Sequence, residues 1–223
     1  MILAAGRGKR MGSLTQTCPK PLLQAGGVTL IEHVIAQLLN AGIREFVINH
    51  AYLGHRIVEH LGDGRRFGAD IVYAAEPEGA LETGGGIMAA LPLLGPDPFL
   101  VANADVWCDL DLATLPWVPA GLAHLVLVAN PDHHAAGDFA VGADGRLNAY
   151  GEPRFTMAGI SVFRPELWNG CRPGRFRIPP LLRYYMGLGQ VSGEVYAGRW
   201  SDVGTPERLA ALDAELRRES RRS

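Results

Sequence analysis

The sequence predicts an α/β fold, a mostly parallel sheet covered by helices, and two observations support that prediction. First, short apolar runs that fit buried strands alternate with amphipathic, helix-like segments between Ile2 and Ala129, which is the order of parallel βαβ units. Second, 223 residues with 48% hydrophobic and 20% charged side chains are typical of a globular chain that buries a core without disulfides, metal or a partner. We therefore expect one domain over residues 1–223.

The predicted strands are short apolar runs bounded by turn residues. The first, Ile2–Ala5, leads directly into a basic, glycine-containing loop from Gly6 to Cys18. Further strands are expected at residues 46–48, 71–75, 99–102, 125–129 and 160–163. After Asn130 the pattern changes, and residues 139–150 are predicted to form a hairpin around an Asp-Gly turn.

The predicted helices have apolar faces and recognisable end signals. In the clearest of them, Thr29–Ala41, Thr29 and Glu32 form a capping box and Gly42 ends the helix. The last helix begins after Thr205, which serves as its cap. Other helices are expected at residues 53–61, 83–91 and 178–186.

Charge and cysteine usage exclude several classes of protein. Twenty-one basic against 23 acidic residues leave a net charge of −2, which gives no electrostatic reason to expect nucleic acid or an anionic membrane as a partner. No apolar stretch approaches the ~18 residues of a membrane span, and no secretory leader is recognised. Three widely spaced cysteines without a CxxC pair are expected to be reduced, as in a cytoplasmic protein. The oligomeric state is not predicted.

The most informative segment is the loop after the first strand. Its glycines allow backbone N–H groups to turn inward, and Arg7, Lys9 and Arg10 place three cations within four residues. Amides and cations together form an anion site suited to a polyphosphate. Lys20 stands between two prolines, which restrict its backbone. A surface turn with hydrated cations is the alternative interpretation of this loop.

Two aspartates stand where a ligand site is expected. Asp105 follows the apolar run 99–102 at the carboxyl edge of a predicted strand, where open α/β sheets bind ligands. Asp202 directly precedes the last helix. A carboxylate pair opposite a cationic phosphate loop suits an Mg²⁺–nucleotide complex, because Mg²⁺ prefers oxygen ligands and bridges protein to phosphate. A loop residue and a helix-entry residue are the simpler alternatives.

Two further clusters allow more than one interpretation. Asp109 and Asp111 form a DxD, the metal motif of many nucleotide-sugar glycosyltransferases, but their position before a predicted helix favours ordinary caps. Gly84, Gly85 and Gly86 open another predicted helix and permit the close approach of a flat ligand such as a nucleobase. A flexible turn is the alternative for these glycines.

Taken together, these segments resemble the sugar-1-phosphate nucleotidyltransferase family. Leu3–Leu22 is similar to its signature LAAGxGxRLxPLTxxxPKPL, Asn103–Asp105 to its metal-binding (G/N)xD, and Trp200–Thr205 to its WxDxGTP. Ala158–Phe163 is similar to its AGIYxF strand. The resemblance spans nearly the whole chain and implies a three-layer, Rossmann-like, mostly parallel sheet of the nucleotide-diphospho-sugar transferase type.

The family implies that an oxygen of a sugar 1-phosphate attacks the α-phosphorus of a nucleoside triphosphate and releases pyrophosphate, with Mg²⁺ as cofactor. The short chain and the segment Leu81–Gly86 favour transfer of UMP from UTP to N-acetylmuramate 1-phosphate. Glucose or mannose 1-phosphate with another triphosphate remains an alternative. Two alternatives from other functional classes also remain: a non-catalytic nucleotide-sensing module, and a glycosyltransferase that uses the DxD.

The same resemblance assigns roles on the nucleotide side, expected to lie within about the first 110 residues. Lys20 would hold the α-phosphate, and Asp105 and Asp202 would bind Mg²⁺; the catalytic set is Arg10, Lys20 and Asp105. Gly84 and Gly85 would approach the base. The complete nucleotide-binding set is Leu3, Ala5, Gly6, Gly8, Lys9, Arg10, Lys20, Gly84 and Gly85.

The sugar side is expected in the remaining half of the chain, on Glu152, Arg154 and Gly159. Many members of the family carry Glu-Lys-Pro before the AGIYxF strand, with the lysine on the sugar phosphate. This chain has Gly151-Glu152-Pro153-Arg154 instead, so the lysine is missing and Arg154 is one candidate to replace it. A lactyl carboxylate on the sugar would favour a guanidinium; the candidates are Arg154, Arg172, Arg175 and Arg177.

Overall fold

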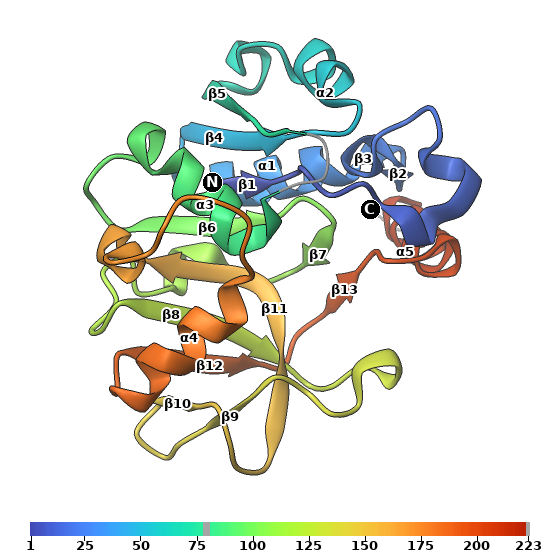
Figure 1. The fold of residues 1–223 in the computed structure, drawn as a ribbon. Helices are drawn as coiled ribbons and strands as arrows, with labels where there is room; N and C mark the ends of the chain where they lie inside the picture. Colours follow the sequence, from blue (N-terminus) through green and yellow to red (C-terminus); the bar gives the residue numbers. More distant parts are fainter. Residues whose placement is uncertain (78–80, 222–223) are drawn as a thin grey trace. The chain divides into compact units, whose positions relative to one another are not determined.

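A computed structural model describes residues 1–77 and 81–221 of the chain (Figure 1). The chain divides into two compact units, each built from separate stretches of sequence. The N-terminal unit comprises Ile2–Ala80, Asn103–Ala113 and Arg199–Ser223. The central unit comprises Met1, Leu81–Ala102 and Thr114–Gly198. The expected division into a nucleotide-binding half to about residue 110 and a sugar-binding half beyond it stays a prediction.

The N-terminal unit contains a parallel sheet formed by β1 (Ile2–Leu3), β4 (Glu45–His50) and β5 (Asp70–Ala75). The connections run through α1 (Leu30–Asn40) and α2 (Gly54–Leu61), visible in blue and cyan in Figure 1. Strand, helix and strand therefore alternate as predicted, and β4 and β5 pair in parallel register from Glu45↔Asp70 to His50↔Ala75.

Helix α1 forms where the sequence predicts it. Thr29 accepts a hydrogen bond from the backbone of Glu32, and the Glu32 side chain accepts one from the backbone of Thr29, so the predicted capping box is complete. The buried face of the helix is apolar and comprises Leu30, Ile31, Val34, Ile35 and Leu38.

The C-terminal segment completes the N-terminal unit. Strand β13 (Trp200–Asp202) pairs with β7 (Val106–Cys108), and α5 (Pro206–Ser220) follows directly. A small hairpin of β2 (Gln24–Ala25) and β3 (Val28–Thr29) lies against α5. One apolar cluster joins these parts, with Ala25, Leu30, Val203 and Leu212 all buried.

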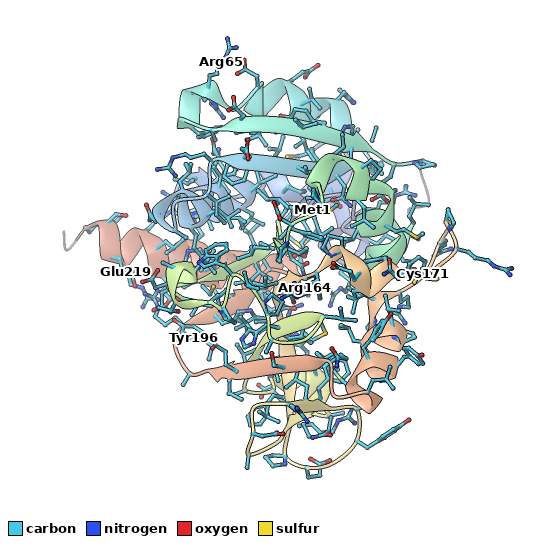
Figure 2. All side chains as sticks on the ribbon, turned by 90° about the vertical axis from the view of Figure 1, so that its left-hand side faces the viewer. Met1, Arg65, Arg164, Cys171, Tyr196 and Glu219 are labelled. Carbon is cyan, nitrogen blue, oxygen red and sulfur yellow. The ribbon has the colours of Figure 1, made fainter. Side chains whose placement is uncertain are left out.

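An arginine before β13 fastens this segment. The Arg199 guanidinium pairs with Glu215 and Glu219 of α5 at 2.6 and 2.8 Å (Glu219 is labelled in Figure 2). It also lies over the Trp107 ring of β7, 4.7 Å from the ring centroid. Sequence patterns did not predict β7, β13, β2 or β3, because each has only two or three residues, too few for a periodic pattern.

The central unit is organised around a ten-residue strand, β11 (Arg154–Phe163). It pairs antiparallel with β6 (Phe99–Asn103), β8 (Ala123–Val128) and β9 (Phe139–Val141), and β9 pairs with β10 (Leu147–Asn148). On its other side, β8 pairs in parallel with β12 (Val191–Tyr196), which sequence patterns did not predict. Every residue of β8 is buried, as expected for a strand with neighbours on both sides.

Two helices belong to the central unit and contact each other: α3 (Glu82–Leu94) and α4 (Ile178–Gly187). Both lie where helices were predicted, although α3 extends three residues further and includes Pro92. Phe99, Phe163 and Trp168 form an aromatic cluster with ring centroids 5.5 to 6.4 Å apart. Across the described residues, no helix combines the length and the apolar character needed to cross a membrane.

Candidate active site

The cationic loop begins at a fixed point. After β1, the backbone N–H of Ala4 donates to Oδ1 of Asn49, at 2.8 Å, and the Asn49 side chain donates in turn to Glu76 at 2.6 Å. Asn49 is buried at the end region of β4. The chain then emerges into solvent, and Gly6, Arg7, Lys9 and Arg10 are exposed. The predicted cations therefore leave a rigid strand edge and remain accessible to a ligand.

Gly8 lies at a tight turn of the loop. Its φ of +65° lies in the left-handed region, and a Cβ at this position would lie only 3.0 Å from Cβ of Lys20 and 3.2 Å from Cγ2 of Thr15. Any larger residue would both strain the backbone and push Lys20 away. The absence of a side chain at Gly8 thus allows the loop to pack directly on Lys20.

Lys20 is buried, with 8% of its surface exposed, in the short turn Lys20–Leu22. The turn packs on α1, and the backbone N–H of Leu22 donates to the Pro19 carbonyl at 2.9 Å. The Lys20 ammonium forms an ion pair with Asp105. A buried ammonium needs such a partner, so Asp105 fixes the direction in which Lys20 points.

The two predicted aspartates meet across the β7–β13 ladder. Asp202 is the register partner of Val106, the residue after Asp105, and the backbone N–H of Val203 donates to the Asp105 carbonyl at 2.9 Å. Asp202 forms an ion pair with Arg208, in the first turn of α5. Two short strands far apart in sequence therefore place the two aspartates at neighbouring backbone positions, and each carboxylate pairs with a cation of its own.

This donor set fits Mg²⁺. Hard carboxylate oxygens are its preferred protein ligands, and it is commonly held by one or two carboxylates together with substrate phosphates rather than by an all-protein cage. Among the described residues, no cluster of three or more His, Cys, Asp or Glu side chains able to hold a metal ion is found. Asp105 and Asp202 are the residues that would hold the ion.

Arg208 is a functional candidate that the sequence reasoning missed. A cation in the first turn of a helix opposes the helix dipole, and this anomaly, two residues after Pro206 of the WxDxGTP segment, is the signal by which the sequence would have identified it. The space where a Cβ of Gly204 would lie is filled by the Arg208 guanidinium, and Nη2 of Arg10 lies 3.1 Å from the same point. Two guanidinium groups thus converge beside Asp202.

The far end of the loop is held by residues at the start of α2, which the sequence reasoning also missed. The Tyr52 hydroxyl donates to the Gln16 carbonyl at 3.0 Å, and the Arg56 guanidinium donates to the carbonyl of Thr17. The Arg7 guanidinium lies 5.0 Å from the centre of the Tyr52 ring. No local sequence signal marks these contacts, because they join loop and helix over more than 30 residues.

In the central unit, the glycines of α3 are packed against their own chain. A Cβ on Gly84 would lie 2.5 Å from Cε2 of Phe176, and a Cβ on Gly85 would collide with the Gly174 carbonyl. The N–H of Gly85 donates to the Phe176 carbonyl at 3.1 Å, and the Trp168 indole donates to the Gly84 carbonyl at 3.0 Å. These contacts give a packing reason for the glycines, while their predicted approach to a base stays a prediction.

Two of the candidate arginines for a carboxylate are also tied to α3. Glu82, the first residue of α3, has a φ of +58°, and its carboxylate pairs with Arg175 at 2.9 Å and with Arg177 at 3.8 Å. Arg172 is exposed. The loop before α4 is therefore fastened to α3 by both ion pairs and backbone hydrogen bonds.

The predicted sugar-side residues lie along or next to β11. Glu152 is exposed. Arg154 donates to the Asp138 carbonyl at 2.5 Å, whereas its Nε is buried and has no hydrogen-bond partner among the described residues. Gly159 has a φ of +79° and lies where the β11–β8 register shifts, between Met157 and Ser161. Their role toward a sugar stays a prediction.

The competing motif at Asp109 and Asp111 is engaged with backbone groups. Asp111 accepts from the N–H of Ala113 at 3.0 Å, and Asp109 accepts from the N–H of Arg199 at 2.8 Å. The Asp111 bond is a local turn bond of the kind that the cap interpretation expects, whereas the Asp109 bond joins two distant segments of the chain. Burial also raises the pKa of the thiols of Cys18, Cys108 and Cys171, which disfavours a cysteine nucleophile.

Comparison with known proteins gives consistent results. A family model described as "Nucleotidyl transferase" matches residues 1–136. The chain is 46% identical over 222 residues to the N-acetylmuramate alpha-1-phosphate uridylyltransferase of Neisseria meningitidis serogroup B, with 96% of each chain covered. It is 33% identical over 231 residues to the enzyme of the same name from Caulobacter vibrioides, covering 97% of this chain and 96% of the relative.

A solved structure shows the same fold. A putative glucose-1-phosphate thymidylyltransferase from Bacillus anthracis superimposes with a TM-score of 0.82 at 22% sequence identity, covering 97% of this chain and 94% of the other. The likeness confirms the predicted mixed α/β fold with a central, mostly parallel sheet.

Proposed function

Because the chain belongs to the nucleotidyl transferase family, we propose that it transfers UMP from UTP to N-acetylmuramate 1-phosphate and releases pyrophosphate. The choice of base and sugar rests on one observation: two relatives that match this chain over nearly the full length of both sequences, at 46% and 33% identity, carry the name of that activity. The site described above supplies the cations and carboxylates that the reaction needs.

In the proposed reaction, a phosphate oxygen of the sugar 1-phosphate forms a bond to the α-phosphorus of UTP. The bond from that phosphorus to the bridging β-oxygen breaks, and pyrophosphate leaves with the electron pair. No protein nucleophile and no proton transfer is required, so the demand on the protein is positioning and stabilisation of charge. Lys20 would hold the α-phosphate, while Gly8, Lys9 and Arg10 would hold the β- and γ-phosphates.

Mg²⁺, held by Asp105 and Asp202, would neutralise phosphate charge and orient the triphosphate when bound. Without it, these carboxylates pair with Lys20 and Arg208, so the same cations become available to phosphate oxygens once the carboxylates are otherwise engaged. Glu152, Arg154 and Gly159 are proposed to contact the sugar, with Arg154 replacing the lysine that many relatives carry. We expect this work to take place in the cytoplasm, on sugar recycled from the cell wall.

A pyrophosphate-release assay tests the proposal. The full-length protein is incubated with Mg²⁺, each of the four nucleoside triphosphates and a series of sugar 1-phosphates. We expect the fastest release with UTP and N-acetylmuramate 1-phosphate. Preference for another pair would correct the substrates, and no turnover with any pair would refute the enzyme, leaving tight nucleotide binding as the mark of a sensing module.

A matched pair of variants tests the site itself. Asp105→Asn removes one charge from the proposed metal site and is expected to abolish most turnover. Asp111→Asn removes a charge from a capping carboxylate nearby in sequence and is expected to leave turnover near that of the wild type. The reverse result, with transfer from a finished UDP-sugar and no pyrophosphate release, would favour the glycosyltransferase alternative.

A further inference from the structure

Two guanidinium groups converge at Gly204, directly after the β13 strand. The position where a Cβ of Gly204 would lie is against Nη2 of Arg208, 3.0 Å from the central carbon of its guanidinium, and 3.1 Å from Nη2 of Arg10. Arg10 belongs to the short helical turn Lys9–Thr15, and Arg208 to α5, and these two elements are in contact. The convergence is therefore built by the packing of the N-terminal unit.

This arrangement is unfavourable unless an anion is present. Arg208 occupies the first turn of α5, where a cation opposes the helix dipole, and two guanidinium groups this close repel each other. One carboxylate, Asp202, pairs with Arg208, and no ion pair to Arg10 is found among the residues that the structure describes. The local charge is thus left positive by one guanidinium, beside the predicted phosphate loop.

We propose that Arg208 is a further substrate-binding residue, which together with Arg10 binds the β- and γ-phosphates of the nucleotide and then the pyrophosphate product. Planar guanidinium groups present paired N–H donors that match phosphate oxygens. Gly204 has the role of leaving room for both groups. This inference rests on the proposed function and adds to its phosphate site a residue contributed by the last helix.

Two roles of Arg208 must be distinguished: binding of the terminal phosphates, and positioning of Asp202, with which it forms an ion pair. If Arg208 contacts the terminal phosphates, its replacement weakens the binding of ligands that carry those phosphates and leaves the binding of UMP, which lacks them, unchanged. If Arg208 only positions Asp202, its effect appears only when a metal ion is bound. Binding measured without metal therefore distinguishes the two roles.

The experiment is calorimetric titration of UTP, UMP and pyrophosphate into the full-length protein in EDTA. We expect Arg208→Gln to weaken pyrophosphate and UTP roughly tenfold, the loss of one charge-assisted hydrogen bond, and to leave UMP unchanged. Arg217→Gln is the matched control, because Arg217 lies on the same helix, is exposed and pairs with Asp213. It is expected to bind all three ligands like the wild type.

A second variant keeps every charge. Gly204→Ala places a methyl group where the guanidinium of Arg208 lies, and the flexible side chain can move away, so the thermal midpoint should stay close to that of the wild type. We expect it to reproduce the weaker pyrophosphate binding of Arg208→Gln. The proposal is overturned if the wild type binds no pyrophosphate without metal, if Arg208→Gln binds it normally, or if that variant loses affinity for UMP as much as for UTP.

The two proposals fail in different ways. Wild-type turnover in the pyrophosphate-release assay together with normal pyrophosphate binding by Arg208→Gln would overturn only the role of Arg208. Weakened pyrophosphate binding by the variant together with no wild-type turnover would overturn the proposed enzyme and leave a triphosphate-binding site.

Discussion

Replacing Gly85 by alanine tests whether the glycines of α3 serve packing. The added methyl group would collide with the backbone carbonyl of Gly174, and it would also lie 3.1 Å from Cβ of Leu81. A backbone oxygen cannot move aside as a side-chain end can. The segment before α4 would therefore have to separate from α3.

The expected cost follows from the contacts that are lost. Overpacking of this kind costs about 1–3 kcal/mol, and the hydrogen bond from Gly85 to the Phe176 carbonyl, at 3.1 Å, contributes roughly 1 kcal/mol. Alanine in place of glycine recovers about 0.5–1 kcal/mol of helix propensity. The net loss is about 2 kcal/mol, which corresponds to a Tm lowered by roughly 4–8 °C in a protein of this size.

The assay is thermal unfolding followed by circular dichroism, with Gly187→Ala as the matched control. Gly187 is likewise a glycine within a helix, the last residue of α4, but no described atom lies within 4 Å of where its Cβ would be. We expect this control to be as stable as the wild type or slightly more stable. Equal midpoints for Gly85→Ala and Gly187→Ala would refute the packing argument, and loss of nucleotide binding in a fully stable Gly85→Ala protein would favour approach to the base.

Three further predictions concern the ion pair, the loop and pH. Lys20→Ala and Asp105→Ala should each remove most turnover and leave a folded protein. We expect each to lower the free energy of unfolding by about 1–2 kcal/mol, less than for a fully buried ion pair because the Asp105 side chain is 34% exposed. In urea unfolding, the double variant should lose less stability than the two single variants added together. Tyr52→Ala should raise the KM for the triphosphate roughly threefold through loss of a cation–π contact, with Tyr52→Phe closer to the wild type in steady-state kinetics. Burial lowers the pKa of His124 in the folded protein, and the charge of Glu194 opposes this shift. As the pH falls, His124 therefore binds a proton more readily in the unfolded chain than in the folded one, so the urea midpoint should fall below about pH 6.5. His124→Gln should reduce that fall.

Clear results would contradict each of these. Retained turnover in both Lys20→Ala and Asp105→Ala would mean that the phosphate and metal assignments are wrong. An equal KM for Tyr52→Ala and Tyr52→Phe would show that the aromatic ring of Tyr52 does not support the loop. A wild-type urea midpoint that is flat from pH 7.5 to 5 would show that His124 gains a partner when protonated.

The sequence predicted most reliably what depends on neighbouring residues. The capping box at Thr29 and the apolar face of α1 are local patterns, and both are present. Lys20 and Asp105 also meet, as the position of Asp105 after a strand led us to expect, whereas Asp202 reaches the site through the antiparallel β7–β13 ladder. Gly8 and Lys20 were identified separately, yet only the structure shows that the first makes room for the second.

What the sequence did not predict depends on pairing between distant segments. Strands β7 and β13 have three residues each, too few for any periodicity, and each exists because the other is present. Arg208 lies on a helix whose pattern explains only its apolar face, and Tyr52 lies in the turn before α2. Their functional meaning comes from what they touch, and that contact is not encoded in the residues beside them.

The three-segment construction of the N-terminal unit has a consequence for how the protein forms. Asp105 is synthesised well before its neighbour Asp202, and β13 and α5 belong to the last stretch of the chain. Contacts between such distant residues form late, because the loop between them must first be closed. On the ribosome, the cationic loop would thus exist for some time without its second carboxylate. The candidate active site is completed only when the final helix has left the exit tunnel, so chains interrupted before Asp202 are expected to be inactive.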